Sequence, residues 1–245
     1  MPLPVLFRSP PRGGGPAYPT VANSLLWINR FESKTDTLGS VPAVNGNAVW
    51  TIKLPSGWGA SLGDGLVRQD TAGSRITYQA NGLQNSSGTR VMNLPGSGIS
   101  LAGNFTIYTI HRKDDFYRAG IILDNTSAGP GLYAGIGDNY VSGNSKALVG
   151  RNDGATILFD SAYYEKAIKK WSRSGSNVYF HEPGAAELTD TLSSTITLTR
   201  FLSSMASEYR FHQLVAVGGY LADGAAEDLA IRSKLLALEP DATDF

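Results

Sequence analysis

The stretch that decides the fold is YRFHQLVAVGGYLADGAAEDLAIRSKLLAL, residues 209–238. Its apolar LVAV run predicts a β-strand, and a Gly-Gly-Tyr turn follows the strand. The only convincing helix pattern of the chain comes next, opening near Asp223 and closing at Pro240. Asp223 can cap this helix, and Glu227 and Asp228 fall in its first turn, where the helix dipole favours acids. We therefore expect a strand-rich domain that ends in one helix.

The predicted helix carries a narrow stripe of mostly small side chains. Such a stripe lets a helix sit close against a sheet, so it predicts the buried face of this helix. Its members are Ala226, Leu229, Ala230, Ser233, Leu236 and Ala237.

Upstream of the helix, short strand patterns alternate with turns rich in Gly, Asn and Ser. Residues 104–112 (NFTIYTIHR), for example, are rich in β-branched and aromatic side chains. Roughly a dozen such runs without intervening helices predict antiparallel sheets in a sandwich. The expected strands are residues 25–31, 48–54, 74–80, 90–94, 104–112, 119–124, 131–137, 146–149, 156–159, 166–171, 177–182, 195–199 and 214–217.

The chain reads as one domain with an extension at its start. Residues 25–238 contain no Pro/Ser-rich break and predict a single sandwich, followed by a short tail at residues 239–245. Residues 1–24 hold six prolines and a Gly-Gly-Gly run, which predict an extended arm without regular pairing. Two interpretations of the arm stay open: it wraps its own domain, or it docks onto another subunit.

Composition excludes several classes of protein. The 21 basic and 21 acidic residues balance, whereas a nucleic-acid binder usually has a basic excess. There are no cysteines, so disulfides and thiolate metal sites are excluded. No signal peptide is visible, and no run approaches the ~18 apolar residues of a membrane span. We expect neither a nucleic-acid partner nor a membrane partner.

Three segments carry a family resemblance: residues 74–112, residues 171–184 (WSRSGSNVYFHEPG) and residues 209–238. Together they resemble the concanavalin A-like lectin/glucanase superfamily in its laminin-G-like branch, although Ile76 stands where proline is common. The resemblance implies an all-β fold, an antiparallel jelly-roll sandwich with one C-terminal helix. Domains of this kind are common on phage virions and in secreted glycan-binding modules.

Catalytic motifs are weak in this chain. The glucanases of the superfamily carry a Glu-x-Asp-x-x-Glu run, because retaining chemistry needs two carboxyl groups about 5 Å apart. No Glu-x-Asp-x-x-Glu run occurs in this chain. Residues 59–63 match Gly-x-Ser-x-Gly, but loop signals flank them where a nucleophile elbow needs a strand and a helix. The three histidines, His111, His181 and His212, form no site by spacing. We expect the protein not to be an enzyme.

A sugar site needs an aromatic platform and polar groups in a preformed cleft. The predicted loop at residues 137–144 and the turn at residues 151–154 supply such groups, and Trp58 in a Gly-rich loop can join them. The alternative is a solvent-facing loop with one packed aromatic ring. The candidate ligand-binding residues are Trp58, Asp138, Asn139, Tyr140, Arg151 and Asp153.

Calcium is the one cofactor that the resemblance leaves open, since lectin-like domains often bind it through loop oxygens. The candidate loops are Asp124-Asn125, Asp138-Asn139 and Asn152-Asp153-Gly154. Each of them also reads as an ordinary turn.

The preferred hypothesis is a non-enzymatic structural or adhesion module of a phage virion, in the capsid decoration or the tail fibre. Residues 1–24 would attach it to other virion subunits, a homo-oligomer would be ordinary, and a surface glycan is a candidate ligand. Two alternatives remain: a soluble carbohydrate-binding lectin domain and a glycan-cleaving enzyme.

Overall fold

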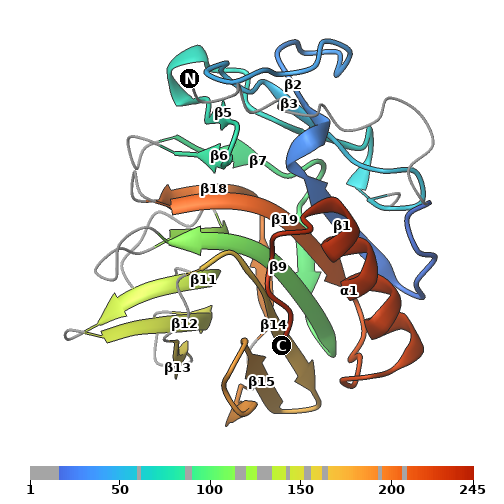
Figure 1. The fold of residues 1–245 in the computed structure, drawn as a ribbon, viewed down its shortest axis with the longest axis vertical. Helices are drawn as coiled ribbons and strands as arrows, with labels where there is room; N and C mark the ends of the chain where they lie inside the picture. Colours follow the sequence, from blue (N-terminus) through green and yellow to red (C-terminus); the bar gives the residue numbers. More distant parts are fainter. Residues whose placement is uncertain are drawn as a thin grey trace, which may run out of the picture.

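The computed structural model describes residues 17–59, 62–85, 90–113, 120–125, 134–141, 144–151, 156–161, 165–192, 195–205 and 209–245. Within them the chain forms two large sheets, a small two-stranded sheet and one α-helix, α1 (Ala226–Leu238). The strands pair with antiparallel register throughout the two large sheets. The predicted antiparallel β-sandwich with a C-terminal helix is confirmed (Figure 1).

The first sheet has eight strands in the order β16-β15-β14-β9-β19-β6-β5, and β1 pairs with β19 beside this path. Its strands are β1 (Ser24–Asn29), β5 (Thr77–Gln79), β6 (Gly82–Gln84), β9 (Phe105–Lys113), β14 (Ala167–Ser174), β15 (Asn177–His181), β16 (Leu188–Thr191) and β19 (Tyr209–Val217). The strand quoted first, β19, lies in its middle.

The second sheet has nine strands in the order β13-β12-β11-β10-β18-β7-β4-β3-β2. They are β2 (Ser33–Lys34), β3 (Thr51–Lys53), β4 (Leu66–Arg68), β7 (Met92–Asn93), β10 (Gly120–Asp124), β11 (Ala134–Val141), β12 (Asn144–Arg151), β13 (Thr156–Asp160) and β18 (Arg200–Met205). The small sheet pairs β8 (Ile99–Leu101) with β17 (Ile196–Leu198).

The first sheet is buried on both faces, which its sequence alternation explains. In β9, Phe105 and Ile107 belong to the main core, whereas Tyr108 and Ile110 belong to a second hydrophobic cluster. That second cluster includes Ile231 and the other apolar residues that α1 turns toward the sheet. Because successive side chains of a strand point to opposite faces, one face of the sheet meets its partner sheet and the other meets α1. Figure 1 shows α1 beside β1 and β19.

The helix buries a different face from the one predicted. Asp228, Ile231, Lys234 and Leu235 are buried, whereas most of the predicted small-residue stripe is exposed. The larger apolar side chains of Ile231 and Leu235 gain more from burial than alanines do. Asp228 can join them because polar groups of the sheet pair with its carboxylate. The prediction from the small-residue stripe was wrong because it considered only the size of the side chains. It left out the polar groups of the sheet that pair with Asp228.

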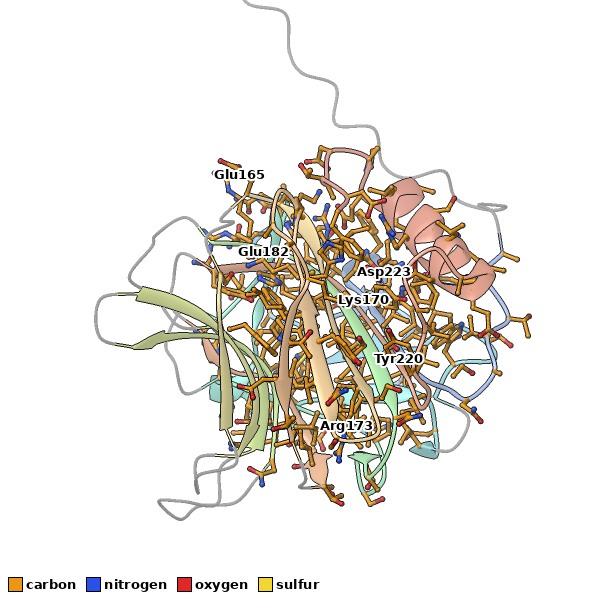
Figure 2. The ribbon with its side chains drawn as sticks, turned by 90° about the horizontal axis from the view of Figure 1, so that it is seen from below. Glu165, Lys170, Arg173, Glu182, Tyr220 and Asp223 are labelled. Carbon is orange, nitrogen blue, oxygen red and sulfur yellow. The ribbon has the colours of Figure 1, made fainter. Side chains whose placement is uncertain are left out.

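The helix also begins later than predicted, at Ala226 rather than near Asp223. Its N-cap residue is Ala225, which makes no side-chain cap hydrogen bond. Asp223 instead forms an ion pair with Lys170 and lies in hydrogen-bond contact with the His181 ring. Figure 2 shows Asp223 beside Lys170. Only the tertiary structure brings these two side chains to Asp223.

The described part of the arm packs on its own domain. The Tyr18 ring lies 4.9 Å from the Trp27 ring, its hydroxyl accepts a hydrogen bond from Asn29, and Val21 is buried. The Ala22 amide donates to Glu227 of α1 at 3.0 Å. Residues 17–24 therefore belong to the domain, and the predicted boundary after residue 24 lies too late. Residues 1–16 lie outside the described residues.

The segment predicted as a tail is likewise part of the domain. Thr243 forms a parallel bridge with Ala167, donates its amide to Lys166 O at 3.0 Å and accepts from the Ile168 amide at 2.9 Å. Glu239 is buried. Residues 239–245 thus extend the pairing of β14.

The observed strands differ from the expected ones where the local sequence pattern was too short to predict a strand. The expected strand at residues 48–54 shrinks to β3, and β2, β4, β6, β8, β16 and β18 were not expected. Most of these have two to four residues, too few to show a period. No helix among the described residues is long and apolar enough to cross a membrane.

Candidate functional site

The five described residues among the six predicted to bind a ligand lie at three separate places in the fold. Asp138, Asn139 and Tyr140 lie in β11 and not in a loop, opposite residues 145–147 of β12. Arg151 pairs with Ala134 at the other end of the same ladder. Asp153 lies outside the described residues.

Trp58 has a packing role. Its side chain is 4 % exposed, and its ring meets the Trp27 ring edge-on at 5.0 Å. Both rings belong to the cluster beneath α1. A ring this deeply buried presents no open face to a sugar, because Trp27 and its neighbours already cover it.

In the first candidate calcium loop, the carboxylate of Asp124 forms an ion pair with Arg200. Asp124 is buried, and its two carboxylate oxygens accept from Arg200 Nε and Nη2 at 2.9 and 2.8 Å. A bidentate arginine pair occupies the oxygens that calcium would need. The Asp138-Asn139 pair lies in β11, and residues 152–154 lie outside the described residues.

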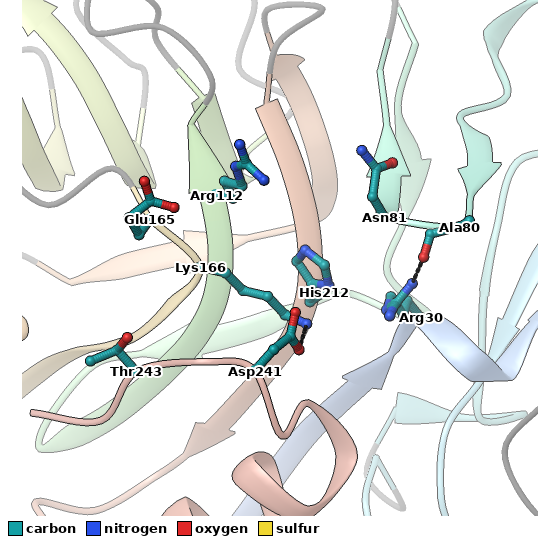
Figure 3. Close-up of a pocket in the computed structure, with 9 residues that line it drawn as sticks. All are labelled: Arg30, Ala80, Asn81, Arg112, Glu165, Lys166, His212, Asp241 and Thr243. Carbon is teal, nitrogen blue, oxygen red and sulfur yellow. Dashed lines mark hydrogen bonds and ion pairs between the residues drawn. The ribbon is translucent and has the colours of Figure 1, made fainter. Parts of the chain in front are cut away.

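A polar pocket of about 460 Å³ lies where several strands of the first sheet end (Figure 3). Six separate parts of the chain line it: the turn after β1, the β5–β6 turn, the end of β9, the start of β14, β19 and the segment after α1. The lining residues are Arg30, Ala80, Asn81, Arg112, Glu165, Lys166, His212, Asp241 and Thr243.

The inner wall of this pocket is held by the buried carboxylate of Glu239. Arg30 Nε and Nη2 donate to its two oxygens at 2.7 and 3.1 Å, and Lys166 Nζ donates to Oε2 at 2.6 Å. Gln213 adds a bond of 3.2 Å to Oε1. Burial alone would raise the pKa of Glu239, but its contacts with His212 and Arg30 outweigh burial and hold that pKa far below the usual range. Glu239 is therefore ionised at neutral pH and fixes both cations in place.

In this inner wall, His212 is the residue whose polar atoms lack well-formed hydrogen bonds. It is 2 % exposed, neither ring nitrogen has a hydrogen-bond partner of good geometry, and its Nδ1 lies 3.4 Å from Glu239 Oε2. Burial lowers the pKa of His212 to about 4, against the pull of Glu239. The imidazole is thus neutral at pH 7, and the positive charge beside Glu239 comes from Arg30 and Lys166.

This shift makes the stability of the fold depend on pH. Below about pH 6.5 the unfolded chain protonates this histidine, whereas the folded chain resists until about pH 4. Stability is therefore lost as the pH falls through that window, by up to about 1.4 kcal/mol per pH unit. We expect urea titrations between pH 7 and 4.5 to show a smaller loss for His212→Gln than for the wild type. Equal losses for the two proteins would contradict the assignment.

The outer rim of the pocket offers polar groups to a ligand. Figure 3 shows Glu165 and Arg112 close together on one side of His212 and Asn81 on the other side, with Asp241 and Thr243 on the segment after α1. These groups include both donors and acceptors, so the rim suits a ligand that itself carries many hydroxyls. No short motif announced the pocket, because its residues are scattered from position 30 to position 243.

No protein-family model matches the chain, and no curated protein sequence matches it. Solved structures do resemble it. One is the sialidase of Trypanosoma rangeli in complex with 2,3-difluoro-KDN, with a TM-score of 0.51 and 13 % identity over 95 % of this chain. A mutant of that sialidase displaying trans-sialidase activity gives a TM-score of 0.52, 13 % identity and 91 % coverage. The chain spans about a third of these sialidases, 36 and 35 % of their lengths.

A second kind of neighbour matches over nearly its whole length. Domain 4 of AbnA, a GH43 extracellular arabinanase from Geobacillus stearothermophilus in complex with arabinotriose, has a TM-score of 0.51 and 13 % identity. The match covers 85 % of this chain and 98 % of that domain. At such identities the likeness shows the fold alone, a β-sandwich that this chain shares with these structures.

Proposed function

We propose that the protein is a non-enzymatic glycan-binding module whose ligand lies in the pocket between Asn81, Arg112 and Asp241. The observation that carries the proposal is a preformed polar hollow of about 460 Å³ whose lining includes both hydrogen-bond donors and acceptors. Its size falls in the range of roughly 300–1,000 Å³ that is common for small-ligand sites. The similarity to an arabinanase domain solved with arabinotriose supports the choice of a sugar.

The wall behind the rim favours binding over catalysis. A glycosidase needs a carboxyl group whose pKa is raised, so that it holds a proton to donate. At Glu239 the contacts with His212 and Arg30 push the pKa the other way. At Asp241 burial raises the pKa, but the bond from Lys166 outweighs it and lowers the pKa. Both carboxylates are therefore poor proton donors, and of the two only the exposed Asp241 lines the pocket, where it can accept from a ligand hydroxyl.

Binding is tested first on an array of arabinans and bacterial and plant polysaccharides, then by calorimetry on the best oligosaccharide. We expect Arg112→Ala to weaken binding about tenfold or more, because a hydrogen bond to a charged group contributes about 1.5–3 kcal/mol. Asn81→Ala should weaken binding less, because a neutral hydrogen bond contributes about 0.5–1.5 kcal/mol. The matched control is Lys53→Ala, which removes an exposed cation from β3 in the other sheet. The same incubations should release no new reducing ends.

Three results would count against this proposal. They are a silent array, equal binding by the Arg112 and Lys53 variants, and cleavage of the oligosaccharide. The last of them would favour the enzyme alternative.

The place on a phage virion, the attachment to other subunits and a homo-oligomeric state stay predictions. Residues 17–24 are occupied by their own domain through Tyr18, Val21 and Ala22. An attachment through the arm would therefore fall to residues 1–16, whose Pro- and Gly-rich composition first suggested it.

A further inference from the structure

A second cluster of polar side chains lies where β15 ends and the connection to α1 begins. His181 is the last residue of β15, Glu187 precedes β16, and Asp223 stands between β19 and α1. One ligand atom from each of the three side chains lies within 4.8 Å of the others. Among the described residues, this is the one group of three or more His, Cys, Asp or Glu side chains so arranged.

The surroundings of this cluster carry more negative than positive charge. Lys170 bonds Oδ1 of Asp223 and lies 3.0 Å from Asp228, which in turn meets Arg232 at 3.4 Å. Arg232 also pairs with Asp244 at 2.8 Å. Four carboxylates thus face two cations, a formal balance of −2 with His181 neutral; the carboxylates are Glu187, Asp223, Asp228 and Asp244.

Glu187 can adapt to a bound ion. Its side chain is exposed, so it can turn toward an ion without repacking the core. A cation between Glu187 and Asp223 would also reduce the repulsion between these two carboxylates.

From this geometry we infer that His181, Glu187 and Asp223 bind a divalent transition metal of the Zn²⁺ class, with solvent completing the coordination. Imidazole nitrogen with two carboxylates is a donor set that zinc accepts and that calcium, which prefers oxygen alone, does not. His181 Nδ1 and Asp223 Oδ2 already face each other at 2.7 Å. Lys170 uses the other oxygen of Asp223, so the ion and the ammonium group need not share one atom.

The inferred ion would link two connections that are distant in sequence. One is the loop between β15 and β16, and the other leads from β19 into α1. Figure 2 shows Asp223 next to Lys170, beside α1. Metal binding at this place should therefore raise the thermal stability of the folded protein, because only the folded chain brings the three ligands together.

The test is a calorimetric titration of the full chain, without a histidine tag, with ZnCl₂ at pH 7 and separately with CaCl₂. We expect one zinc per chain, no calcium binding at the same concentrations, and a higher Tm with zinc. His181→Ala and Glu187→Gln should each weaken zinc binding about tenfold or more. Asp190→Asn is the matched control, since it removes an exposed acid three positions from Glu187.

Several outcomes would overturn the inference. They are no zinc binding, zinc binding that Glu187→Gln leaves unchanged, and loss of binding in Asp190→Asn as well. A site filled by calcium and not by zinc would also overturn it. If His181→Ala fails to fold, Glu187→Gln decides alone, because its side chain is exposed. None of these results depends on whether a glycan binds the pocket near Arg112.

Discussion

Replacement of Asp228 by asparagine is expected to lower the free energy of unfolding by about 3–5 kcal/mol. Its carboxylate is fully buried and accepts from the Tyr108 hydroxyl at 2.6 Å, Lys170 Nζ at 3.0 Å and the Gly224 amide at 3.0 Å. Loss of this charge leaves the buried ammonium of Lys170 with Asp223 as its remaining acid. The measurement is urea unfolding at pH 7, followed by circular dichroism.

A double-mutant cycle separates the ion pair from general disruption. Lys170→Met alone should also be strongly destabilising, because it leaves the buried carboxylate of Asp228 with the more distant Arg232, at 3.4 Å, as its remaining cation. The double variant should lose clearly less than the two single losses added together, since it removes both charges. Additive losses would show that Asp228 and Lys170 do not depend on each other.

The second large effect is expected at Gly98, in the turn that leads into β8. Gly98 has φ +77°, and a Cβ added there would overlap the backbone carbonyl of Leu198 in β17. Gly98→Ala should therefore cost about 2–5 kcal/mol, through left-handed strain and displacement of the β8–β17 pair. Thermal and urea unfolding of the variant would measure this loss.

Gly96→Ala is the control for this prediction. Gly96 lies in the same turn with φ +60°, but the nearest atom to an added Cβ is Leu62 O at 3.5 Å, an ordinary contact. This variant should cost only the backbone strain, about 1–2 kcal/mol. If both variants lost the same stability, the close approach of Leu198 would not matter.

Two buried ion pairs in this protein are built in the same way. Lys170 and Asp228 lie beneath α1, and Arg30 and Glu239 lie beside the pocket. In each case a segment from the C-terminal part of the chain brings a carboxylate to a cation, which lies in β14 (Lys170) or directly after β1 (Arg30). The C-terminal segment is thus fixed by ion pairs as well as by the apolar contacts of Ile231 and Leu235.

The candidate sites show what sequence patterns could not supply. Tyr140 and Arg151 were expected in a loop and a turn that together line one site, but β11 and β12 place them at opposite ends of a ladder. Trp58 looked available for stacking, but Trp27 covers it. Conversely, His181 and Asp223 are 42 positions apart and attracted no attention together, yet they lie in hydrogen-bond contact.

The sequence by itself determined the class of fold. Alternating apolar residues in runs such as residues 104–112 and 214–217 specify strands with two buried faces, and the helical run after the Gly-Gly-Tyr turn specifies the one helix. These patterns are local, because a strand or helix displays its period over a few neighbouring residues. The tertiary structure alone decided which face of α1 is buried, where the arm joins the domain, and which charges meet. Those outcomes depend on contacts between positions far apart in the chain, and no local period records them.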